Sequence, residues 1–269
     1  MVVDLKKTNL SSENAMFKAE LLMVSDVHLR GPDDVRCRLL CDVVDRAMSG
    51  SVKTFLLLGD IFDFCIGGPK FYRQKYQVLS GKLEALAASG TRVIFLEGNH
   101  EFSMTAMRWK GVEVVQSEAM MLECGAKIAI RHGDLLNAPK SYRLFRWALK
   151  SRMIRGIAAA IPATVMESYA LSHAKISRSR DQYRHLDHSG LMAAANVWLQ
   201  ETSALHGIFG HFHVPYAEPR EAGAGKILSV SSWDDPNFLI FNAGKFSRGI
   251  FDQSTLEWRF EDIKSFFVK

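Results

Sequence analysis

The segment LLMVSDVH at residues 21–28 carries the pattern from which the fold and the site can be predicted. An apolar run of strand length ends at a serine, and two possible metal ligands, Asp26 and His28, follow directly. The segments FLLLGD (55–60) and VIFLEGNH (93–100) repeat this order of an apolar run and then polar ligands. Because ligands of open α/β sheets bind beyond the carboxyl ends of the strands, these polar side chains are expected to meet at one edge of a sheet.

Helical spacing between these runs predicts a layered α/β domain. Residues Asp34–Met48 and Phe71–Ala88 show this spacing, and Gly50 and Gly90 are plausible helix ends. The resulting β-α-β-α-β order is typical of a domain in which helices cover a sheet. Further strands are expected at Met120–Cys124, Lys127–Arg131, Gly207–Phe209, Lys226–Val230, Phe238–Phe241 and Leu256–Phe260.

A helical segment interrupts this strand-rich sequence. Strand signals vanish from residue 137 to about residue 201, where aromatic, aliphatic and basic residues recur at helical intervals. The net charge of +5 is concentrated here, because residues 135–166 contain six basic residues and no acid. We therefore divide the chain into a lead-in (1–20), a core (21–136 and 202–269) and a helical insertion (137–201).

The composition excludes several classes of protein. With 48% apolar and 23% charged residues it is typical of a soluble globular chain, and its first 20 residues lack the apolar stretch of a secretory signal. No apolar run approaches the ~18–20 residues that span a bilayer. Cys37 and Cys41 lie four apart on a predicted helix, where packing explains them better than zinc binding. We expect a cytoplasmic protein without structural disulfides.

Five short polar motifs follow apolar strands in order along the chain: DVH, GD, GNH, HGD and GHFH. One such motif can arise by chance, but five at the ends of strands indicate a single site. Together they supply seven possible metal ligands: Asp26, His28, Asp60, Asn99, His132, His211 and His213.

These oxygen and nitrogen donors, without a thiolate, favour Mn²⁺, with Fe²⁺ or Zn²⁺ as alternatives. Seven ligands are too many for one transition ion and suit two divalent ions about 3.5–4 Å apart that share a carboxylate. Asp60 is the expected shared ligand, because no other residue of its motif can reach both ions. A glycine precedes Asp60, Asn99 and His211, which allows tight turns close to the metals.

The ordered set DxH, GD, GNH, H and GHxH resembles the signature of the calcineurin-like metallophosphoesterase superfamily over nearly the whole chain. The resemblance implies a four-layer α-β-β-α sandwich with a helical lid insertion. It also implies that Asn99 and His100 are catalytic, with His100 near the scissile phosphate as a general acid or as a stabiliser of developing charge. One ion would be held by Asp26, His28, Asp60 and His213, and the other by Asp60, Asn99, His132 and His211.

Two such ions would lower the pKa of a bound water from ~15.7 toward neutrality and hold the phosphate oxygens for in-line attack. Glu101 and Asp134 lie beside the ligands in sequence. They are expected to orient the histidines, although ordinary solvated carboxylates would also explain them.

The insertion contains a basic amphipathic helix with two possible roles. Tyr142, Phe145, Leu149 and Met153 would share one helical face, and Arg143, Arg146 and Lys150 an adjoining one. Such a helix beside a catalytic site would suit acyl chains and anionic headgroups at a membrane surface. Alternatively, the apolar face packs on the core and the cations are solvated.

Four stretches are similar to the UDP-2,3-diacylglucosamine pyrophosphatases of lipid A biosynthesis: GDIFDFCIGG, HGDLLNAPKSYRLFR, Ser232-Trp233 and GHFHVP. The resemblance implies attack of hydroxide on the α-phosphate of UDP-2,3-diacylglucosamine, giving UMP and 2,3-diacylglucosamine 1-phosphate (lipid X). It implies that the insertion is a lid for two acyl chains, and that the enzyme is peripheral on the inner face of the inner membrane. The substrate-binding residues would be Ser172, Lys175, Ser177, Arg178, Arg180 and Trp233.

The chain departs from that family where Gly-Asn-His-Glu (98–101) replaces Gly-Asn-Arg-Asp, and Ala-Pro-Lys (138–140) replaces an acidic pair. Another lipid-linked or nucleotide phosphodiester or diphosphate is therefore an alternative substrate. A nuclease would need a basic groove with stacking aromatic residues, and the apolar insertion argues against this and against a nucleic-acid partner. A cyclic-nucleotide phosphodiesterase would not need the insertion. A non-enzymatic scaffold would usually have lost a ligand. No obligate protein partner is expected.

Overall fold

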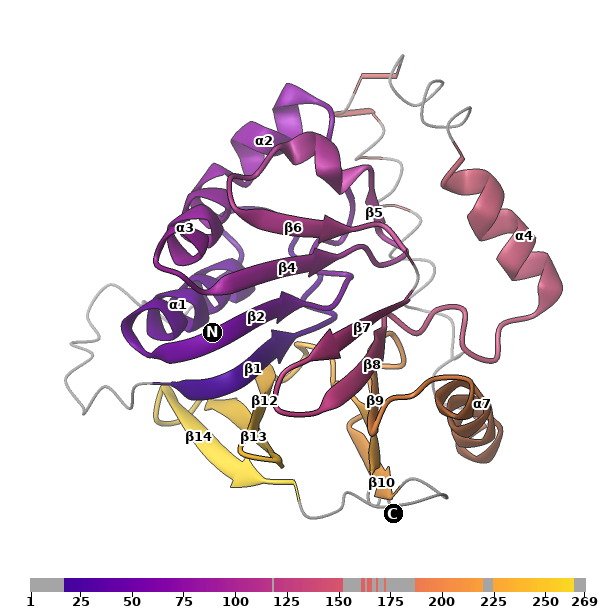
Figure 1. Ribbon diagram of the computed structural model, residues 1–269. Helices are drawn as coiled ribbons and strands as arrows, with labels where there is room; N and C mark the ends of the chain where they lie inside the picture. Colours follow the sequence, from indigo (N-terminus) through magenta and orange to yellow (C-terminus); the bar gives the residue numbers. More distant parts are fainter. Residues whose placement is uncertain are drawn as a thin grey trace.

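The computed structural model describes residues 17–117, 119–151, 187–219 and 225–263, with a few isolated positions between residues 161 and 172. The chain forms two large sheets and helices that cover their outer faces (Figure 1). In this part of the chain no helix combines the length and the apolar character needed to cross a membrane.

The first sheet has seven strands, and the four strands of the β-α-β core run parallel within it. The three C-terminal strands extend the sheet on the other side of β1, and each runs antiparallel to its neighbour. In spatial order the strands are β14 (Glu257–Asp262), β13 (Lys245–Asp252), β12 (Asn237–Asn242), β1 (Lys18–Val24), β2 (Ser51–Leu57), β4 (Arg92–Leu96) and β6 (Val112–Val115).

The second sheet has five strands and stacks on the first. In spatial order they are β10 (Tyr216–Pro219), β11 (Lys226–Ser229), β9 (His206–Phe209), β8 (Lys127–Arg131) and β7 (Ala119–Glu123). A short pair, β3 (Cys65–Ile66) and β5 (Glu101–Phe102), links two of the loops beyond the first sheet.

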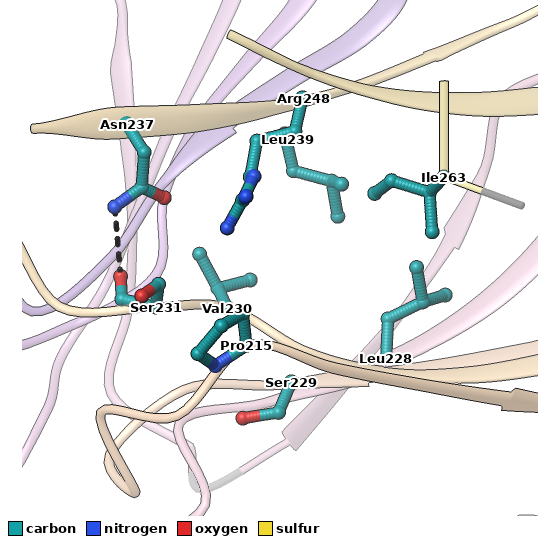
Figure 2. Close-up of a pocket in the computed structure, with 9 residues that line it drawn as sticks. All are labelled: Pro215, Leu228, Ser229, Val230, Ser231, Asn237, Leu239, Arg248 and Ile263. Atoms are coloured by element: carbon teal, nitrogen blue, oxygen red, sulfur yellow. Dashed lines mark hydrogen bonds between the residues drawn. The ribbon is translucent and has the colours of Figure 1, made fainter. Parts of the chain in front are cut away.

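Successive side chains of each strand in the first sheet point to opposite faces of the sheet. In β1, Leu21 and Met23 face the second sheet, whereas Leu22 and Val24 face the helices. Because both faces are buried, the strands read as continuous apolar runs. One cavity between the sheets, beside Leu228 and Leu239, measures about 20 Å³, room for about one water (Figure 2). This cavity is therefore too small for a substrate.

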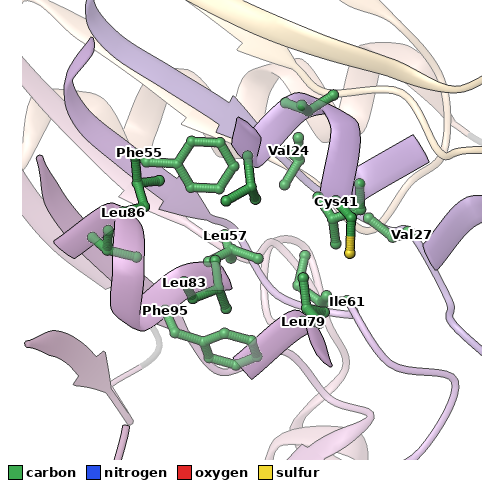
Figure 3. Packing of buried hydrophobic residues seen from close by; sticks show 14 of the residues in the cluster. Val24, Val27, Cys41, Phe55, Leu57, Ile61, Leu79, Leu83, Leu86 and Phe95 are labelled. Carbon is green, nitrogen blue, oxygen red and sulfur yellow. The ribbon is translucent and has the colours of Figure 1, made fainter. Parts of the chain in front are cut away.

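The helices form the outer layers of a four-layer sandwich. On the first sheet, Leu79, Leu83 and Leu86 pack against Phe55 and Phe95 of the strands (Figure 3). On the second sheet the outer layer is α7, as its cluster with strand residues of that sheet shows. The helices are α1 (Val35–Ser49), α2 (Lys70–Lys75), α3 (Gln77–Ala88), the 3-10 helix η2 (Met104–Met107), α4 (Lys140–Leu149) and α7 (His188–Gln200).

The predicted four-layer α/β class is confirmed, and the structure alters several boundaries. The helix expected at Phe71–Ala88 is interrupted at Tyr76, whose ψ of 23° lies outside the helical region. β1 begins at Lys18, inside the expected lead-in, and five strands were not expected: β3, β5, β6, β10 and β13. In the described chain all four cysteines are free, and Cys37 and Cys41 pack in the core.

The expected insertion at residues 137–201 is divided between two roles. α7 buries Leu191, Ala195 and Leu199 against the second sheet and so belongs to the core. α4 lies apart from α7, beyond the end of the sheets that carries the polar motifs (Figure 1). Residues 152–160 and most of those up to 186 lie outside the described residues.

Candidate metal centre

Five loops bring the expected ligands together at one edge of the sandwich. They follow β1, β2 and β4 of the first sheet and β8 and β9 of the second. Backbone hydrogen bonds connect neighbouring loops: the Asp26 amide donates to the Gly59 carbonyl at 3.1 Å, and the Gly210 amide to the His132 carbonyl at 2.8 Å. The convergence expected from the strand ends is therefore present.

The first group of ligands contains Asp26, His28 and His213, whose ligand atoms all lie within 4.8 Å of one another. The Nε2 atoms of His28 and His213 are 3.2 Å apart. Asp26 Oδ1 lies 3.6 Å from His213 Nε2. Three donor atoms directed at one point in this way could hold one metal ion.

The second group contains Asp60, His132 and His211, with Asn99 beside them. His132 Nε2 lies 3.3 Å from Asp60 Oδ2 and 3.0 Å from Asn99 Oδ1. His100 lies between the groups, because its Nε2 is 3.8 Å from Asp60 Oδ2 and its ring centroid is 5.1 Å from that of His28. His100 is thus placed to touch a molecule bound at both groups.

Backbone strain marks the same residues. Asp26, His28, Asp60, His211 and His213 all have φ between 51° and 71°, a left-handed conformation that non-glycine residues rarely adopt. Each such residue costs of order 1–3 kcal/mol and persists only where the surrounding structure imposes it. The loops therefore hold these ligands in place as part of the folded chain itself.

Two glycines allow the loops to approach closely. A Cβ atom on Gly98 would lie 2.5 Å from the Asp60 backbone nitrogen, and one on Gly210 would lie 2.6 Å from Asp26 Oδ2. Both distances are far below a normal contact of about 3.5 Å. The expectation that glycines beside the ligands permit tight turns is confirmed at these positions.

Asp26 presents one oxygen to the site. Its Oδ2 accepts hydrogen bonds from Ser25 Oγ at 2.5 Å and from the His211 backbone amide at 2.9 Å. Its Oδ1 is buried and accepts no hydrogen bond from the described residues. A buried carboxylate oxygen without a donor, facing two imidazole nitrogens, fits a divalent cation.

Burial and charge set the protonation of the groups. Burial lowers the pKa of His28 to about 4, and burial together with His132 lowers the pKa of His211 to about 4, so both are neutral at pH 7. Neutral imidazole is the form that binds metals. Burial opposes ionisation of Asp60, but His100 and His132 outweigh it and hold its pKa well below the usual value. Burial likewise opposes protonation of His132, but Asp60 raises its pKa to about 10.

Glu101 supports the ligand loops through the backbone, whereas a histidine partner was expected. Its Oε2 accepts hydrogen bonds from the amides of Asp60 at 2.9 Å and Gly98 at 2.8 Å, and its Oε1 from that of Phe62 at 3.0 Å. The carboxylate is fully buried and joins the loops after β2 and β4. Glu101 thus fixes the spacing between two loops that carry ligands.

A residue overlooked in the sequence, Asp63, lies behind two histidines of the site and makes a hydrogen bond to one of them, His100, through its backbone carbonyl. Its Oδ1 lies 3.7 Å from His28 Nδ1, and its carbonyl oxygen lies 2.7 Å from His100 Nδ1. The signal was present in GDIFDF, where Asp63 follows Asp60 by three residues. Carboxylates and carbonyls behind ligating histidines fix the tautomer and the orientation of the ring.

The geometry agrees with comparison to known proteins. A family model described as calcineurin-like phosphoesterase matches residues 20–215. This chain belongs to the calcineurin-like phosphoesterase family. It is therefore a metallophosphoesterase, and members of this family use divalent metals. The two groups of donors around Asp26 and Asp60 fit that requirement.

Several relatives of this phosphoesterase share the name UDP-2,3-diacylglucosamine hydrolase. The protein from Neisseria gonorrhoeae is 25% identical over 71% of this chain and 80% of its own. Those from Blochmanniella pennsylvanica and Aliivibrio fischeri are 27% and 25% identical over 72% of this chain and 79% and 82% of theirs. The solved structure of Vps29 from Entamoeba histolytica with zinc has a TM-score of 0.46 at 14% identity, covering 91% of this chain and 99% of that one.

Helix α4 approaches the metal centre with its basic face. Arg146 is 8% exposed and pairs with Asp134, and Lys150 Nζ donates to the Gly98 carbonyl at 2.7 Å. The opposite face leaves Leu144 and Trp147 exposed by 65% and 72%. The sequence suggested either a membrane-facing helix or a helix whose apolar face packs on the core with solvated cations. Neither describes this orientation, because Arg146 and Lys150 are turned inward and apolar residues face outward.

The expected substrate-binding residues are only partly described. Lys175, Ser177, Arg178 and Arg180 lie outside the described residues, and the hydroxyl of Ser172 donates to the Ser168 carbonyl at 2.8 Å. The expectation for Trp233 needs correction. Its side chain is 1% exposed and packs against Trp258 in the core, so it does not line an open cleft. Its backbone amide instead donates to the Asp26 carbonyl at 3.1 Å and supports that loop.

Proposed function

We propose that this phosphoesterase hydrolyses the pyrophosphate bond of UDP-2,3-diacylglucosamine, producing UMP and 2,3-diacylglucosamine 1-phosphate. The relatives that align with 71–72% of this chain carry the name of that hydrolase, at 25–27% identity. Identity at this level supports the reaction class more strongly than the substrate. The outward face of α4 is the observation from this chain that favours a lipid-linked substrate.

That face places exposed apolar side chains beside a phosphate site. Leu144, Phe145 and Trp147 are 65%, 59% and 72% exposed on α4. The same helix contacts Gly98, which precedes the ligand Asn99. An acyl chain gains about 0.8 kcal/mol for each methylene that it buries, so such a surface favours an acylated sugar over a plain one. It also suits contact with the inner face of the inner membrane, where we place the enzyme.

The seven expected ligands would hold two divalent ions, which we propose to be Mn²⁺, with Asp60 shared between them. When bound, such ions lower the pKa of water toward neutrality and neutralise charge on a phosphate. Asn99 would contribute its Oδ1, which lies 3.0 Å from His132 Nε2. The loops hold these donors through Glu101 and the close approach at Gly98.

His100 would act on the phosphate itself. Its Nδ1 is 2.7 Å from the Asp63 carbonyl, so a proton on that atom is fixed and Nε2 faces Asp60 and the substrate. In the reaction the oxygen of water bonds to the α-phosphorus, and the bond from this phosphorus to the bridging oxygen breaks. That oxygen leaves with the sugar 1-phosphate, and protonated His100 would donate a hydrogen bond to a phosphate oxygen as charge develops.

The test compares UMP release from UDP-2,3-diacylglucosamine and from unacylated UDP-GlcNAc, each with Mn²⁺. We expect kcat/KM to favour the acylated substrate by at least about 100-fold, equivalent to burying only three or four methylenes. Hydrolysis of bis(p-nitrophenyl) phosphate, which has neither acyl chain nor nucleotide, shows that each preparation is active. Equal rates on the two UDP-sugars from an active preparation would rule out the acylated substrate.

A further inference from the structure

Two buried contacts join helix α4 to the loops that carry metal ligands. Lys150 is the C-cap residue of α4 and follows Arg146 by four residues, so the two side chains project from the same side of the helix. Arg146 is 8% exposed and the Lys150 side chain 17% exposed. Both point into the protein, unlike the cations of an ordinary surface helix.

Lys150 contacts the loop that leads to Asn99. Its Nζ donates to the Gly98 carbonyl at 2.7 Å and lies 3.4 Å from Glu97 Oε2. Glu97 is 2% exposed, and its Oε1 accepts a hydrogen bond from the Met104 amide at 2.6 Å. Lys150 therefore supplies positive charge to a buried acid two residues before Asn99, and holds the carbonyl directly before it.

Arg146 makes the equivalent contact on the loop that carries His132. It pairs with Asp134, which is 5% exposed and also accepts from the Tyr142 hydroxyl at 3.4 Å. These two partners of Asp134, Arg146 and Tyr142, both lie on α4. Arg143 extends the attachment by donating to the Leu135 carbonyl at 2.9 Å.

We infer that Arg146 and Lys150 are positioning residues: by docking α4 on the loops of Asn99 and His132, they set the second group of ligands for catalysis. A buried carboxylate that loses a paired cation is disfavoured, so the docking of α4 stabilises Asp134 and Glu97 in the positions they hold beside the ligand loops. The inference rests on the phosphoesterase activity of the family and is independent of the proposed lipid substrate.

The rival role for these cations is direct contact with substrate. Arg146 is almost fully buried and already paired with Asp134, which leaves its guanidinium little surface for a phosphate. A substrate-binding role would appear mainly in KM for the natural substrate. A positioning role would appear in kcat for any phosphodiester and in the affinity for metal, because outer partners of metal ligands tune both.

The experiment measures hydrolysis of bis(p-nitrophenyl) phosphate and Mn²⁺ binding by calorimetry for the full chain. Arg146→Met and Lys150→Met should each lower kcat and weaken Mn²⁺ binding about 10-fold or more, with KM changed less than about 2-fold. Lys150→Arg should recover most of the activity. Lys140→Met is the matched control, because Lys140 is exposed at the start of the same helix, and it should behave as the parent enzyme.

Asp134→Asn combined with Arg146→Met tests the mechanism and also guards against misfolding. The double variant leaves no unpaired buried charge and should lose no more activity than Arg146→Met alone, since both changes break one contact. Unchanged kcat and Mn²⁺ affinity in folded Lys150→Met and Arg146→Met would overturn the inference. Additive losses in the double variant, or an effect confined to KM, would do the same.

Discussion

Replacing Gly98 by alanine tests whether the loops of Asn99 and Asp60 must touch. The added methyl would lie 2.5 Å from the Asp60 backbone nitrogen and closer still to its carboxylate. Because carbon normally stays about 3.5 Å from such atoms, the two loops would have to separate by about 1 Å. Gly98 lies outside the positive-φ region, so the effect is steric and not a matter of backbone strain.

The size of the effect follows from this displacement. A misplacement of about 1 Å at a reacting site costs on the order of 100-fold in rate. Overpacking of a buried contact also lowers the free energy of unfolding by about 1–3 kcal/mol. In a chain of this size each kcal/mol lowers Tm by roughly 2–4 °C. We therefore expect a folded protein with a modestly lower Tm and about 1% of the parent rate.

The assay is hydrolysis of bis(p-nitrophenyl) phosphate at saturating Mn²⁺, with bound Mn²⁺ measured in parallel. Gly81→Ala is the matched control: Gly81 lies within α3, and a Cβ there meets no atom within 4 Å. That substitution should leave the rate unchanged and stabilise the protein by about 0.5–1 kcal/mol. If Gly98→Ala also kept the parent rate and metal content, the close contact between the loops would not be needed to place Asp60.

Three further predictions concern the ligands, His100 and α4. Asp60→Ala or His211→Ala should reduce kcat by about 1,000-fold or more and lower the Mn²⁺ content; near-normal turnover would contradict the two-ion site. His100→Ala should lower kcat by about 100- to 10,000-fold while metal content stays unchanged, and loss of metal would mean that His100 is a ligand. Trp147→Ser should raise KM for UDP-2,3-diacylglucosamine about 10-fold. If the variant kept the KM of the parent enzyme, Trp147 would not belong to the acyl-binding surface. Hydrolysis of bis(p-nitrophenyl) phosphate is the control reaction for this variant.

Local sequence was sufficient to predict that the polar motifs meet at one edge of the sheets, and to predict the first parallel strands of the fold. Asp26 and Asp60 each follow a short apolar run, and such a run is recognised by its continuous apolar residues and the polar residue after it. The structure brings both residues to one edge because parallel strands end together there. The β1-α1-β2 order and the strand β4 were predictable for the same reason, whereas β3 and the break between α2 and α3 were not.

Long-range pairing was not predictable in this way. β13 was overlooked because its apolar residues, Phe246, Ile250 and Phe251, do not alternate regularly along a mostly polar run. Its pairing with β12 and β14 completes it as a strand. α7 resembles the rest of the insertion in composition, yet it packs on the second sheet. Trp233 looked like a cleft residue from its motif, although the core around Trp258 encloses it.

The sequence by itself determined which polar residues follow the strands and are candidates for metal binding, because residue type and the ends of strands are local properties. Only the tertiary structure decided which face of α4 meets the protein. Helical periodicity shows that Arg146 and Lys150 share a face, but it does not show where the acids that pair with them lie. Lys150 meets Glu97 from 53 residues away, and a pairing over that distance in sequence is set by the folded loops. For that reason the basic face of the helix lies against the metal centre while its apolar residues face outward.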